Sequence, residues 1–491
     1  MVSRDLIQKL LEESLRTGAD FAEVFVEDST KSFLVYQSWR VDRMKEGRDY
    51  GLGLRLIRGL QMAYGSTSDL RPGNLSKLVQ DTARALNKSP QAALTNLTLD
   101  SCNKDMPGVD TETNAGLEAG PRQPRVQLRA PEPDRGLMPV RIEPQEISLR
   151  EKAQFLREAH DAAMAFAITV QMASCVYSEQ DQRVLIVNSE GLWVEDRRPR
   201  IQIHVGVVAG DGKRKEFGEA IQAAAQGWEF CQQLDARALG REAARQAIAM
   251  TCASYAPRGT MPVILDRGAG AVLFHEACGH GLEAYQVAQG HSVYAGKLGT
   301  AIASPLVTAI DDGSICGGWG SSNYDDEGTP TQKNVLIEKG ILKSYLVDRL
   351  SGKSLGLAPT GSSRRRSFHF APVSRMNNTY IAPGESTWEE MLAATQYGLY
   401  AKKLGGGSVN VASGNFHFGV MEAYLIENGQ ITDPVRGAII IGQGAEVLKK
   451  IDMVGKDLLL VPAGCRAVSG EIPVGMGQPP LRVQELTVGG R

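Results

Sequence analysis

Two histidines in a glycine-rich stretch have the residue types, and nearly the spacing, of a catalytic zinc site. The stretch AVLFHEACGHGLEA, residues 271–284, places His275 and His280 five positions apart, with Glu276 directly after the first histidine. This H-E-x-x-x-H pattern is one residue longer than H-E-x-x-H, in which the two histidines bind zinc and the glutamate acts as general base. The stretch therefore suggests hydrolysis by a metal-activated water.

The additional residue changes the backbone that the site requires. On a regular α-helix, two side chains five residues apart are separated by about 140° around the axis, so they could not both face one ion. A one-residue π-bulge would return them to one face. Gly279 and Gly281 flank His280 and would tolerate either that bulge or a helix end. The sequence thus predicts an irregular helical segment.

A catalytic zinc site also needs a third protein ligand and one open position. The residues that could supply this ligand are Cys278, Glu283, His291, His369, His417 and Cys465. We expect Cys278 to point away from the face of His275, and residue chemistry alone leaves the choice among the others open. Glu276 would lie beside the ion, where a carboxylate can accept a proton from water whose pKa has fallen to roughly 7.

The order of helical and strand patterns predicts an α+β fold with two domains. Residues 1–256 combine amphipathic helical patterns with strand patterns such as FAEVFVED and IQIHVGVVAG, which predicts an α/β N-terminal domain with a mixed sheet and helices. After YAPRGT the glycine density rises and the strands shorten, so residues 257–491 are predicted to form a β-rich C-terminal domain. Residues from about 99 to 146 show neither period and are predicted to form a long loop.

Composition limits the partners and the location of the protein. Among 491 residues, 54 Lys and Arg nearly balance 56 Asp and Glu, so there is no global positive field that would attract nucleic acid or a membrane surface. No run approaches the roughly 18 apolar residues of a membrane helix, and the N-terminus lacks the apolar core of a signal peptide. Seven scattered cysteines do not suggest a disulfide framework. We therefore expect a cytoplasmic protein.

Several further motifs occur in a fixed order with the histidine stretch. They are DDEGTPTQKNVLIEKGIL, TGSSRRRSF, SRMNNTYI, AGCRAVSGEIPVGMGQPPLRV and a closing TVGG. Together they resemble the TldD/PmbA family of intracellular metalloproteases, weakly over the N-terminal domain and strongly from about residue 260 to the end. The intact H-E-x-x-x-H pattern is similar to that of the zinc-bearing, TldD-like branch.

The resemblance implies a site, a substrate class and an assembly. It implies zinc held by His275, His280 and Cys465, with Glu276 as general base. It also implies hydrolysis of unfolded or extended peptides, and a homodimer or a heterodimer with a zinc-free family member. The family's older label, modulator of DNA gyrase, finds no support in the charge balance of this chain.

Other polar residues allow more than one interpretation. Arg364, Arg365 and Arg366 could bind a substrate carboxylate or stabilise an oxyanion, or form a turn with structural ion pairs. The acidic run Asp325, Asp326 and Glu327 could anchor a loop near the metal, pair with those arginines, or simply form a turn. His369 and His417 could face the substrate carbonyl or be half-buried strand residues, whereas His160, His204 and His291 are expected to be structural.

Two alternative functions remain beside the peptidase. One is a non-catalytic peptide-binding or assembly subunit, against which the intact Glu276 argues. The other is a zinc amidase that acts on a small substrate. Glycine-bordered strands such as GSVNVASG offer sheet edges to which an extended peptide could add as a strand.

Overall fold

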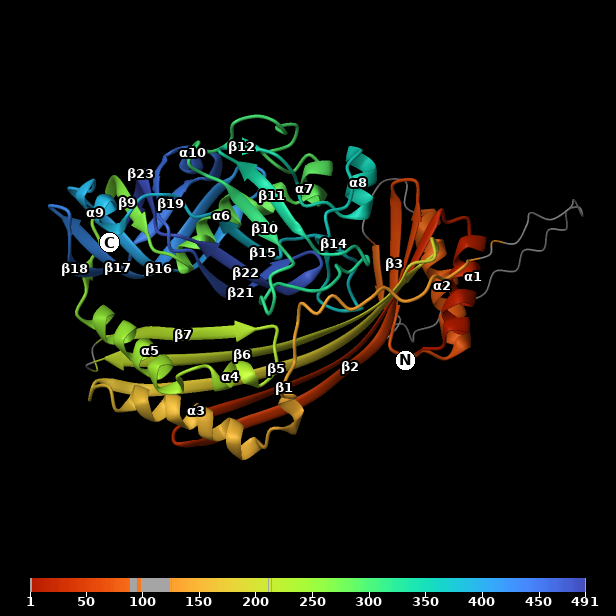
Figure 1. Ribbon diagram of the computed structural model, residues 1–491, viewed down its shortest axis with the longest axis horizontal. Helices are drawn as coiled ribbons and strands as arrows, with labels where there is room; N and C mark the ends of the chain where they lie inside the picture. Colours follow the sequence, from red (N-terminus) through yellow and green to blue (C-terminus); the bar gives the residue numbers. More distant parts are fainter. Residues whose placement is uncertain are drawn as a thin grey trace, which may run out of the picture.

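The structure is a computed structural model that describes residues 2–88, 95–98, 124, 126–210, 212 and 214–490. A long curved sheet from the N-terminal half lies along one side of the molecule, and the C-terminal half packs against its concave face (Figure 1). Helices and strands mix in the first half and strands dominate the second, so the predicted α+β class with a β-rich C-terminal region is confirmed. Among the described residues, no helix combines the length and apolar content needed to cross a membrane.

Among the described residues, the N-terminal sheet has seven strands in the order β4-β3-β2-β1-β5-β6-β7. Its strands are β1 (Phe21–Gln37), β2 (Arg40–Arg58), β3 (Gln61–Thr67), β4 (Thr95–Thr98), β5 (Val170–Asn188), β6 (Trp193–Gly210) and β7 (Lys215–Ala224). Neighbouring strands are antiparallel except for the β3–β4 pair. Strands β1, β2, β5 and β6 have 17 to 19 residues, which gives the sheet its length.

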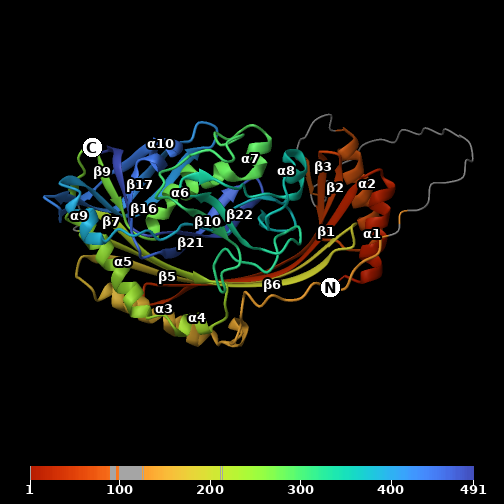
Figure 2. The same ribbon diagram turned by 45° about the horizontal axis from the view of Figure 1, so that its top comes forward.

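The described helices of the N-terminal half cover one face of this sheet (Figure 2). They are α1 (Arg4–Arg16), α2 (Pro72–Lys88), α3 (Leu149–Met164), α4 (Glu229–Gln232) and α5 (Ala236–Thr251). Side chains alternate across a strand. On β1, Val24 therefore packs with α1 and α2, and Leu34 packs with α3 and α5, whereas Phe25 packs on the other face against Phe368 of the C-terminal half. The second face is thus reserved for the contact between the two halves.

Two further sheets form the C-terminal half. One has the order β12-β11-β10-β15-β22-β21, and the other has the order β16-β9-β23-β19-β17-β18-β8, with β20 paired to β23. Their strands are β8 (Ser254–Tyr255), β9 (Gly259–Leu265), β10 (Ala309–Asp312), β11 (Lys333–Glu338), β12 (Ile341–Leu342), β15 (Asn378–Ile381), β16 (Tyr397–Asn410), β17 (Asn415–Glu427), β18 (Gln430–Arg436), β19 (Ile439–Gln443), β20 (Ile451–Val454), β21 (Leu459–Ala467), β22 (Gly470–Gln478) and β23 (Leu481–Gly489). A short β13–β14 pair (Ser363–Arg364 and Val373–Ser374) lies outside both sheets.

Short helical segments complete the C-terminal half. They are η3 (Ala269–Ala271), α6 (Val272–Ala277), η4 (Gly279–Leu282), α7 (Ala284–Ala288), α8 (Arg349–Leu355), α9 (Trp388–Ala393) and α10 (Gly444–Lys449). On α6, Leu273 and Phe274 are buried in one core with residues of both large sheets, including Val263 of β9 and Ile381 of β15. This apolar anchoring fixes the helix that carries the first histidine.

The predicted loop at 99–146 is described only from its later part, and residues 99–123 and 125 lie outside the described residues. Residues 126–143 contain no helix or strand, as expected, and a short 3-10 helix, η2, follows at Pro144–Glu146. Arg135 donates through Nη1 to the carbonyls of Asn323 at 2.6 Å and Thr331 at 2.7 Å, which ties this segment to the C-terminal half. The division of the chain into 1–256 and 257–491 stays a prediction. Strand β8, at residues 254–255, pairs with β18, so the chain enters a sheet of the C-terminal half just before the predicted boundary.

Candidate metal centre

The helix that carries His275 ends before it reaches His280. A helix end is one of the two arrangements that the sequence predicts, and a π-bulge is the other. Helix α6 ends at Ala277, Cys278 has φ −131° and ψ −50°, and the 3-10 helix η4 begins at Gly279. A Cβ atom on Gly279 would lie 2.3 Å from the sulfur of buried Met376, so a larger residue at this position would require Met376 to move. The helix end therefore replaces the bulge and turns His280 back toward His275.

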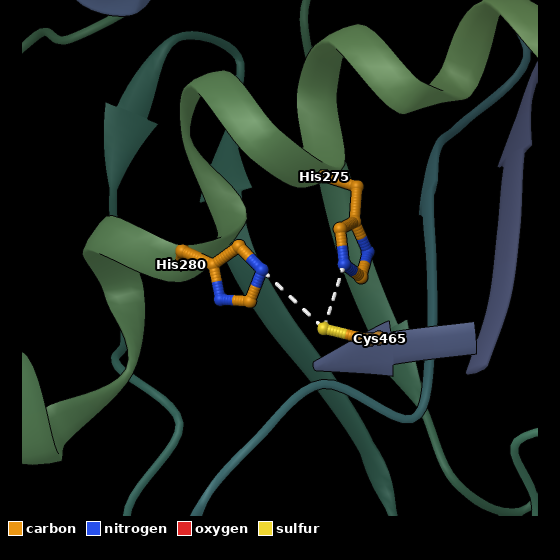
Figure 3. Close-up of side chains that lie close together, drawn as sticks. All are labelled: His275, His280 and Cys465. Carbon is orange, nitrogen blue, oxygen red and sulfur yellow. Dashed lines mark hydrogen bonds between the residues drawn. The ribbon is translucent and has the colours of Figure 1, made fainter. Parts of the chain in front are cut away.

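Three side chains converge from segments that are far apart in the sequence. His275 on α6 and His280 on η4 both point toward Cys465 on β21 (Figure 3). The Sγ atom of Cys465 lies 3.2 Å from Nε2 of His275 and 3.3 Å from Nε2 of His280. All three side chains are buried, and their potential ligand atoms lie within 4.8 Å of one another. Among the described residues this is the group of three that could hold a metal ion.

The electrostatics of the cluster favour a thiolate at Cys465. Burial raises the pKa of the Cys465 thiol, but the charge and hydrogen bonds of His275 and His280 outweigh burial and lower that pKa to about 3. The thiolate is the form of cysteine that binds metals. Tetrahedral zinc with Zn–S of about 2.3 Å and Zn–N of about 2.0 Å separates sulfur from nitrogen by roughly 3.5 Å. The observed separations are a few tenths of an ångström shorter, so two imidazoles and one thiolate fit such an ion.

Two buried residues, Glu283 and Arg375, contact the side chains of the cluster and hold them in position. Glu283 places Oε1 3.2 Å from Nδ1 of His280, an arrangement that fixes the ring and leaves Nε2 for the cluster. Burial lowers the pKa of His280, but the charge of Glu283 and the bonds to Cys465 raise it well above the ordinary value. Arg375 donates through Nη2 to the carbonyl of Cys465 at 2.7 Å and to its Sγ at 3.1 Å. Nδ1 of His275, by contrast, is buried with no hydrogen-bond partner among the described residues.

Glu276 lies on the accessible side of the cluster. Its Oε2 is 3.7 Å from Nε2 of His280, and its side chain is 28% exposed, against 11% for His280. A carboxylate in this position can reach water beside the three ligand atoms. The geometry therefore matches the predicted role of a base, and the role itself stays a prediction.

The other candidate ligands lie elsewhere. Cys278 is fully buried in the core of the C-terminal half, where burial raises its pKa to about 12, so it faces away from the cluster as expected. Glu283 contacts His280 from behind and does not point into the cluster. His291 is exposed, His369 packs against the ring of Phe368, and His417 is exposed on β17 with Nδ1 3.5 Å from Oγ of Ser408.

The acidic run and the arginine run form ion pairs that join the two halves. Arg365 donates through Nη2 to Oε1 of Glu23 at 2.7 Å, and its side chain is 0% exposed. Asp326 accepts from Arg198 at 2.5 Å, and Glu327 accepts from Arg55 at 2.6 Å. These contacts support a structural role for Arg365 in place of the expected substrate contact. For exposed Arg366 and for His417, substrate contact stays a prediction.

Two residues contribute to the site in roles that the sequence did not predict, Arg375 and Glu283. Arg375 belongs to the SRMNNTYI motif, but nothing in its local pattern shows that it contacts Cys465, which lies 90 residues further along the chain. The sequence holds no local signal for this contact, because SRMNNTYI is largely polar and its burial is seen only in the structure. Glu283 was considered as a ligand, whereas the structure places it as the partner of His280.

Comparison with known proteins identifies the family of the chain and agrees with its fold. Residues 22–86, 142–251 and 258–490 match, in order, domain 1, the central domain and the C-terminal domain of the PmbA/TldA metallopeptidases. The chain therefore belongs to the PmbA/TldA metallopeptidase family, and the predicted family and enzyme class are confirmed.

Three individual relatives illustrate the range of similarity. The Metalloprotease TldD homolog of Haemophilus influenzae is 40% identical over 351 residues, which cover 70% of this chain and 73% of that protein. The Zinc metalloprotease TldD homolog of Saccharolobus solfataricus is 34% identical over 47% of this chain and 52% of its own length. The crystal structure of TldE from Thermococcus kodakarensis has a TM-score of 0.72 and 20% identity, covers 99% of this chain and 100% of its own, and shows the shared fold.

Proposed function

We propose that this protein is a zinc-dependent peptidase that hydrolyses unfolded or extended peptides, with Glu276 as the general base. The observation that carries the proposal is the convergence of His275, His280 and Cys465 beside a partly exposed glutamate. Membership in a metallopeptidase family supports the reaction class. The name of the Saccharolobus solfataricus relative supports zinc as the metal.

The donor set of the cluster suits zinc. His275 and His280 would each supply Nε2, and Cys465 would supply its thiolate, which leaves one position of a tetrahedron open. When bound there, zinc would act as a Lewis acid that acidifies water and polarises a peptide carbonyl. Glu283 would hold the His280 ring, and Arg375 would stabilise the negative charge of the cysteine sulfur.

Glu276 would move the proton in the hydrolysis. Its carboxylate would take a proton from the attacking water and then deliver that proton to the amine of the leaving peptide. Its position on the exposed side of His280 supports this role, because the substrate must reach the cluster from the accessible side. Nε2 of each histidine and the thiolate of Cys465 would be bound to the metal, so these atoms would not compete for the proton.

An extended peptide is the substrate form that we propose. Strand β16 pairs with β17 along its length, but only residues 399–401 pair with β9 on its other side among the described strands. The glycine-rich part of β16, which includes Gly405 and Gly407, therefore offers main-chain groups to an added strand. Such pairing selects backbone conformation more than side chains, which would give broad specificity.

The assembly and the location of the enzyme are also proposals. We propose a dimer, either of two copies or with a zinc-free family member, that limits access to the buried cluster and so spares folded proteins. We propose that it acts in the cytoplasm without binding nucleic acid or membrane, in line with a net charge of −2. Light scattering on active fractions tests the assembly, and a monomer that retains full activity would overturn it.

One experiment separates the peptidase from its two alternatives. Zinc per chain is measured by elemental analysis, and hydrolysis is measured on an unstructured fluorogenic peptide and on a panel of small amides, before and after dialysis against a chelator. A peptidase should lose peptide hydrolysis with its zinc and regain it on adding zinc back. A peptide-binding subunit would bind the peptide without turnover, and a zinc amidase would cleave only the small amides.

A further inference from the structure

A cavity of about 370 Å³ lies between the N-terminal sheet and the C-terminal half. One wall comes from β1, β5 and β6, and the other comes from the loop at 319–326, the arginine run and the β21–β22 hairpin. The residues that give it a basic lining are Lys31, Arg198, Arg200, Arg364, Arg365 and Arg366. Gly464 also lines the cavity and directly precedes Cys465 on β21. The cavity therefore borders the strand that carries this candidate metal ligand.

Arg200 is a buried guanidinium with weak partners. Its residue is 6% exposed, and its hydrogen bonds to the carbonyls of Trp319 and Ser321 are 3.4 and 3.5 Å long. Ordinary N–H···O bonds are about 2.7–3.2 Å long. Among the described residues, no carboxylate lies within 4.0 Å of Arg200, although a buried charge normally requires a close counter-charge.

The nearby carboxylates are committed to other partners. Asp196 accepts from Arg198 at 3.0 Å and from the amide of Asn323 at 2.9 Å. Asp326 accepts from Arg198 at 2.5 Å and from the backbone N–H of Arg365 at 2.6 Å. All four oxygens of the two aspartates therefore have donors.

The carboxylate at the β21–β22 hairpin does not offset this positive charge. Glu471 lines the cavity but pairs with exposed Arg466 at 2.8 Å. Asp196 and Asp326 therefore offset the positive charge of Arg200 only in part, because both form their ion pairs with Arg198.

Arg364 is a second buried cation, and no carboxylate of the described residues lies within 4.0 Å of its guanidinium nitrogens. It is 6% exposed and donates to the carbonyls of Met376 at 2.6 Å and Pro473 at 2.8 Å. Burial and the positive charges of Arg364 and Arg198 together lower the pKa of Arg200 to about 9, although the charges of Asp196 and Asp326 act in the opposite direction. Burial likewise lowers the pKa of Arg364 to about 10. Exposed Arg366 extends the same positive charge along the cavity lining.

We propose that this cavity is an oxyanion-binding site in which Arg200 and Arg364 receive a carboxylate or a phosphate group. A guanidinium offers a planar fork of donors that matches either group, and partial desolvation strengthens the interaction. Two sources fit this chemistry, a free small anion and the carboxylate of a bound peptide. The second source rests on the proposed peptidase function, whereas the anion site itself does not.

The first test uses inorganic phosphate as the probe. Calorimetric titration at constant ionic strength should show phosphate binding to the zinc-loaded protein, and phosphate should raise its melting temperature more than chloride does. Arg200→Met should weaken phosphate binding about 10- to 100-fold, the scale of a lost hydrogen bond to a charged group. Arg84→Met, which removes an exposed arginine of α2, should bind as the wild type does.

The melting temperature of Arg200→Met provides a second measurement, independent of phosphate binding. Because methionine fills the same space without a buried charge, Arg200→Met should melt at or above the wild-type temperature in chloride. A purely structural arginine would instead lower the melting temperature and leave phosphate binding intact in the folded fraction. Should Arg200→Met fail to fold, Arg366→Met removes an exposed cation of the same cavity and should weaken phosphate binding by a smaller factor.

The second test distinguishes the two sources. In a Glu276→Gln background, which should prevent turnover, a hexapeptide with a free C-terminal carboxylate is compared with its C-terminal amide. A preference for the acid that Arg200→Met abolishes assigns the site to a peptide carboxylate. Phosphate binding that depends on Arg200, without that preference, assigns it to a free anion. Equal phosphate binding by wild type and Arg200→Met overturns the anion site, whatever the outcome of hydrolysis assays.

Discussion

Two buried polar regions of this molecule are built on opposite principles. The interdomain charge network consists of Glu23, Arg55, Arg198, Asp326, Glu327 and Arg365, and its cations and anions alternate. Arg55 lies 2.6 Å from both Glu23 and Glu327, and Arg365 lies 2.7 Å from Glu23. The candidate metal centre instead directs three electron-pair donors toward one point.

The difference shows how a structural cluster can be told from a functional one. Each charge in the network is paired with an opposite charge inside the protein. The network therefore contributes to the contact between the two halves. In the candidate centre the supporting contacts of Glu283 and Arg375 lie behind the ligands, and Glu276 lies at the accessible side. We therefore expect changes in the centre to affect zinc and turnover, and changes in the network to affect stability.

The largest effect is expected from Cys465→Ser. Loss of the thiolate leaves two imidazoles, which bind zinc weakly, so zinc should fall from about one per chain to a small fraction and hydrolysis should disappear with it. Elemental analysis and a fluorogenic peptide assay measure both quantities. Cys278→Ser is the matched control, because this cysteine is buried in the core away from the cluster. If Cys278→Ser lost the zinc and Cys465→Ser kept it, the ligand assignment would be wrong.

Glu276→Gln should separate metal binding from chemistry. Glutamine keeps the size of the side chain but cannot take the proton, so kcat should fall by about 10²- to 10⁴-fold while zinc per chain stays unchanged. Steady-state kinetics with parallel metal analysis test this expectation. Retention of wild-type kcat would show that another group is the base.

Glu283→Gln should have an intermediate effect on the centre. The neutral amide holds the His280 ring less strongly, so zinc affinity should fall about 10- to 100-fold, the usual scale for a partner of a metal-binding histidine. Competition with a chromogenic chelator measures the affinity. At saturating zinc the variant should recover hydrolysis, which a direct role in catalysis would prevent. Glu446→Gln, at an exposed position on α10, serves as control.

The residues of the candidate site that lie close together in the sequence could be predicted from their spacing, whereas the more distant residues could not. Spacing identified His275, Glu276 and His280, because their chemistry depends on neighbours in one short segment. Cys465 could be selected only through the family resemblance, since 185 residues separate it from His280. The helix ends before His280 in place of a bulge, and the close approach of Met376 to Gly279 at this point is a tertiary contact that no local pattern contains.

The long-range ion pairs could not be predicted for the same reason. The fold class followed from periodicity and turn residues, which act locally. The partners of the arginine run and the acidic run lie on strands of the other half, as Glu23 does for Arg365 across 342 positions. Whether an arginine is structural depends on such a partner, and this distinguishes Arg365 from Arg200 although the sequence shows two similar residues.

The smallest effect on catalysis, with a large effect on stability, is expected from Arg55→Met. Removing this cation leaves Glu23 and Glu327 buried with one strong partner fewer each, which should lower the free energy of unfolding by about 3–5 kcal/mol. Zinc per chain and kcat, measured well below the melting transition, should match the wild type.

Arg48→Met is the control on the same strand, β2. Its ion pair with Asp28 is exposed and should contribute about 1 kcal/mol or less. Denaturant unfolding compares the two variants, provided that the two halves unfold in one transition. A drop in zinc content of folded Arg55→Met would mean that the network and the candidate centre are coupled. In that case the network would help to position the ligands, and the separation between a structural and a functional region would not hold.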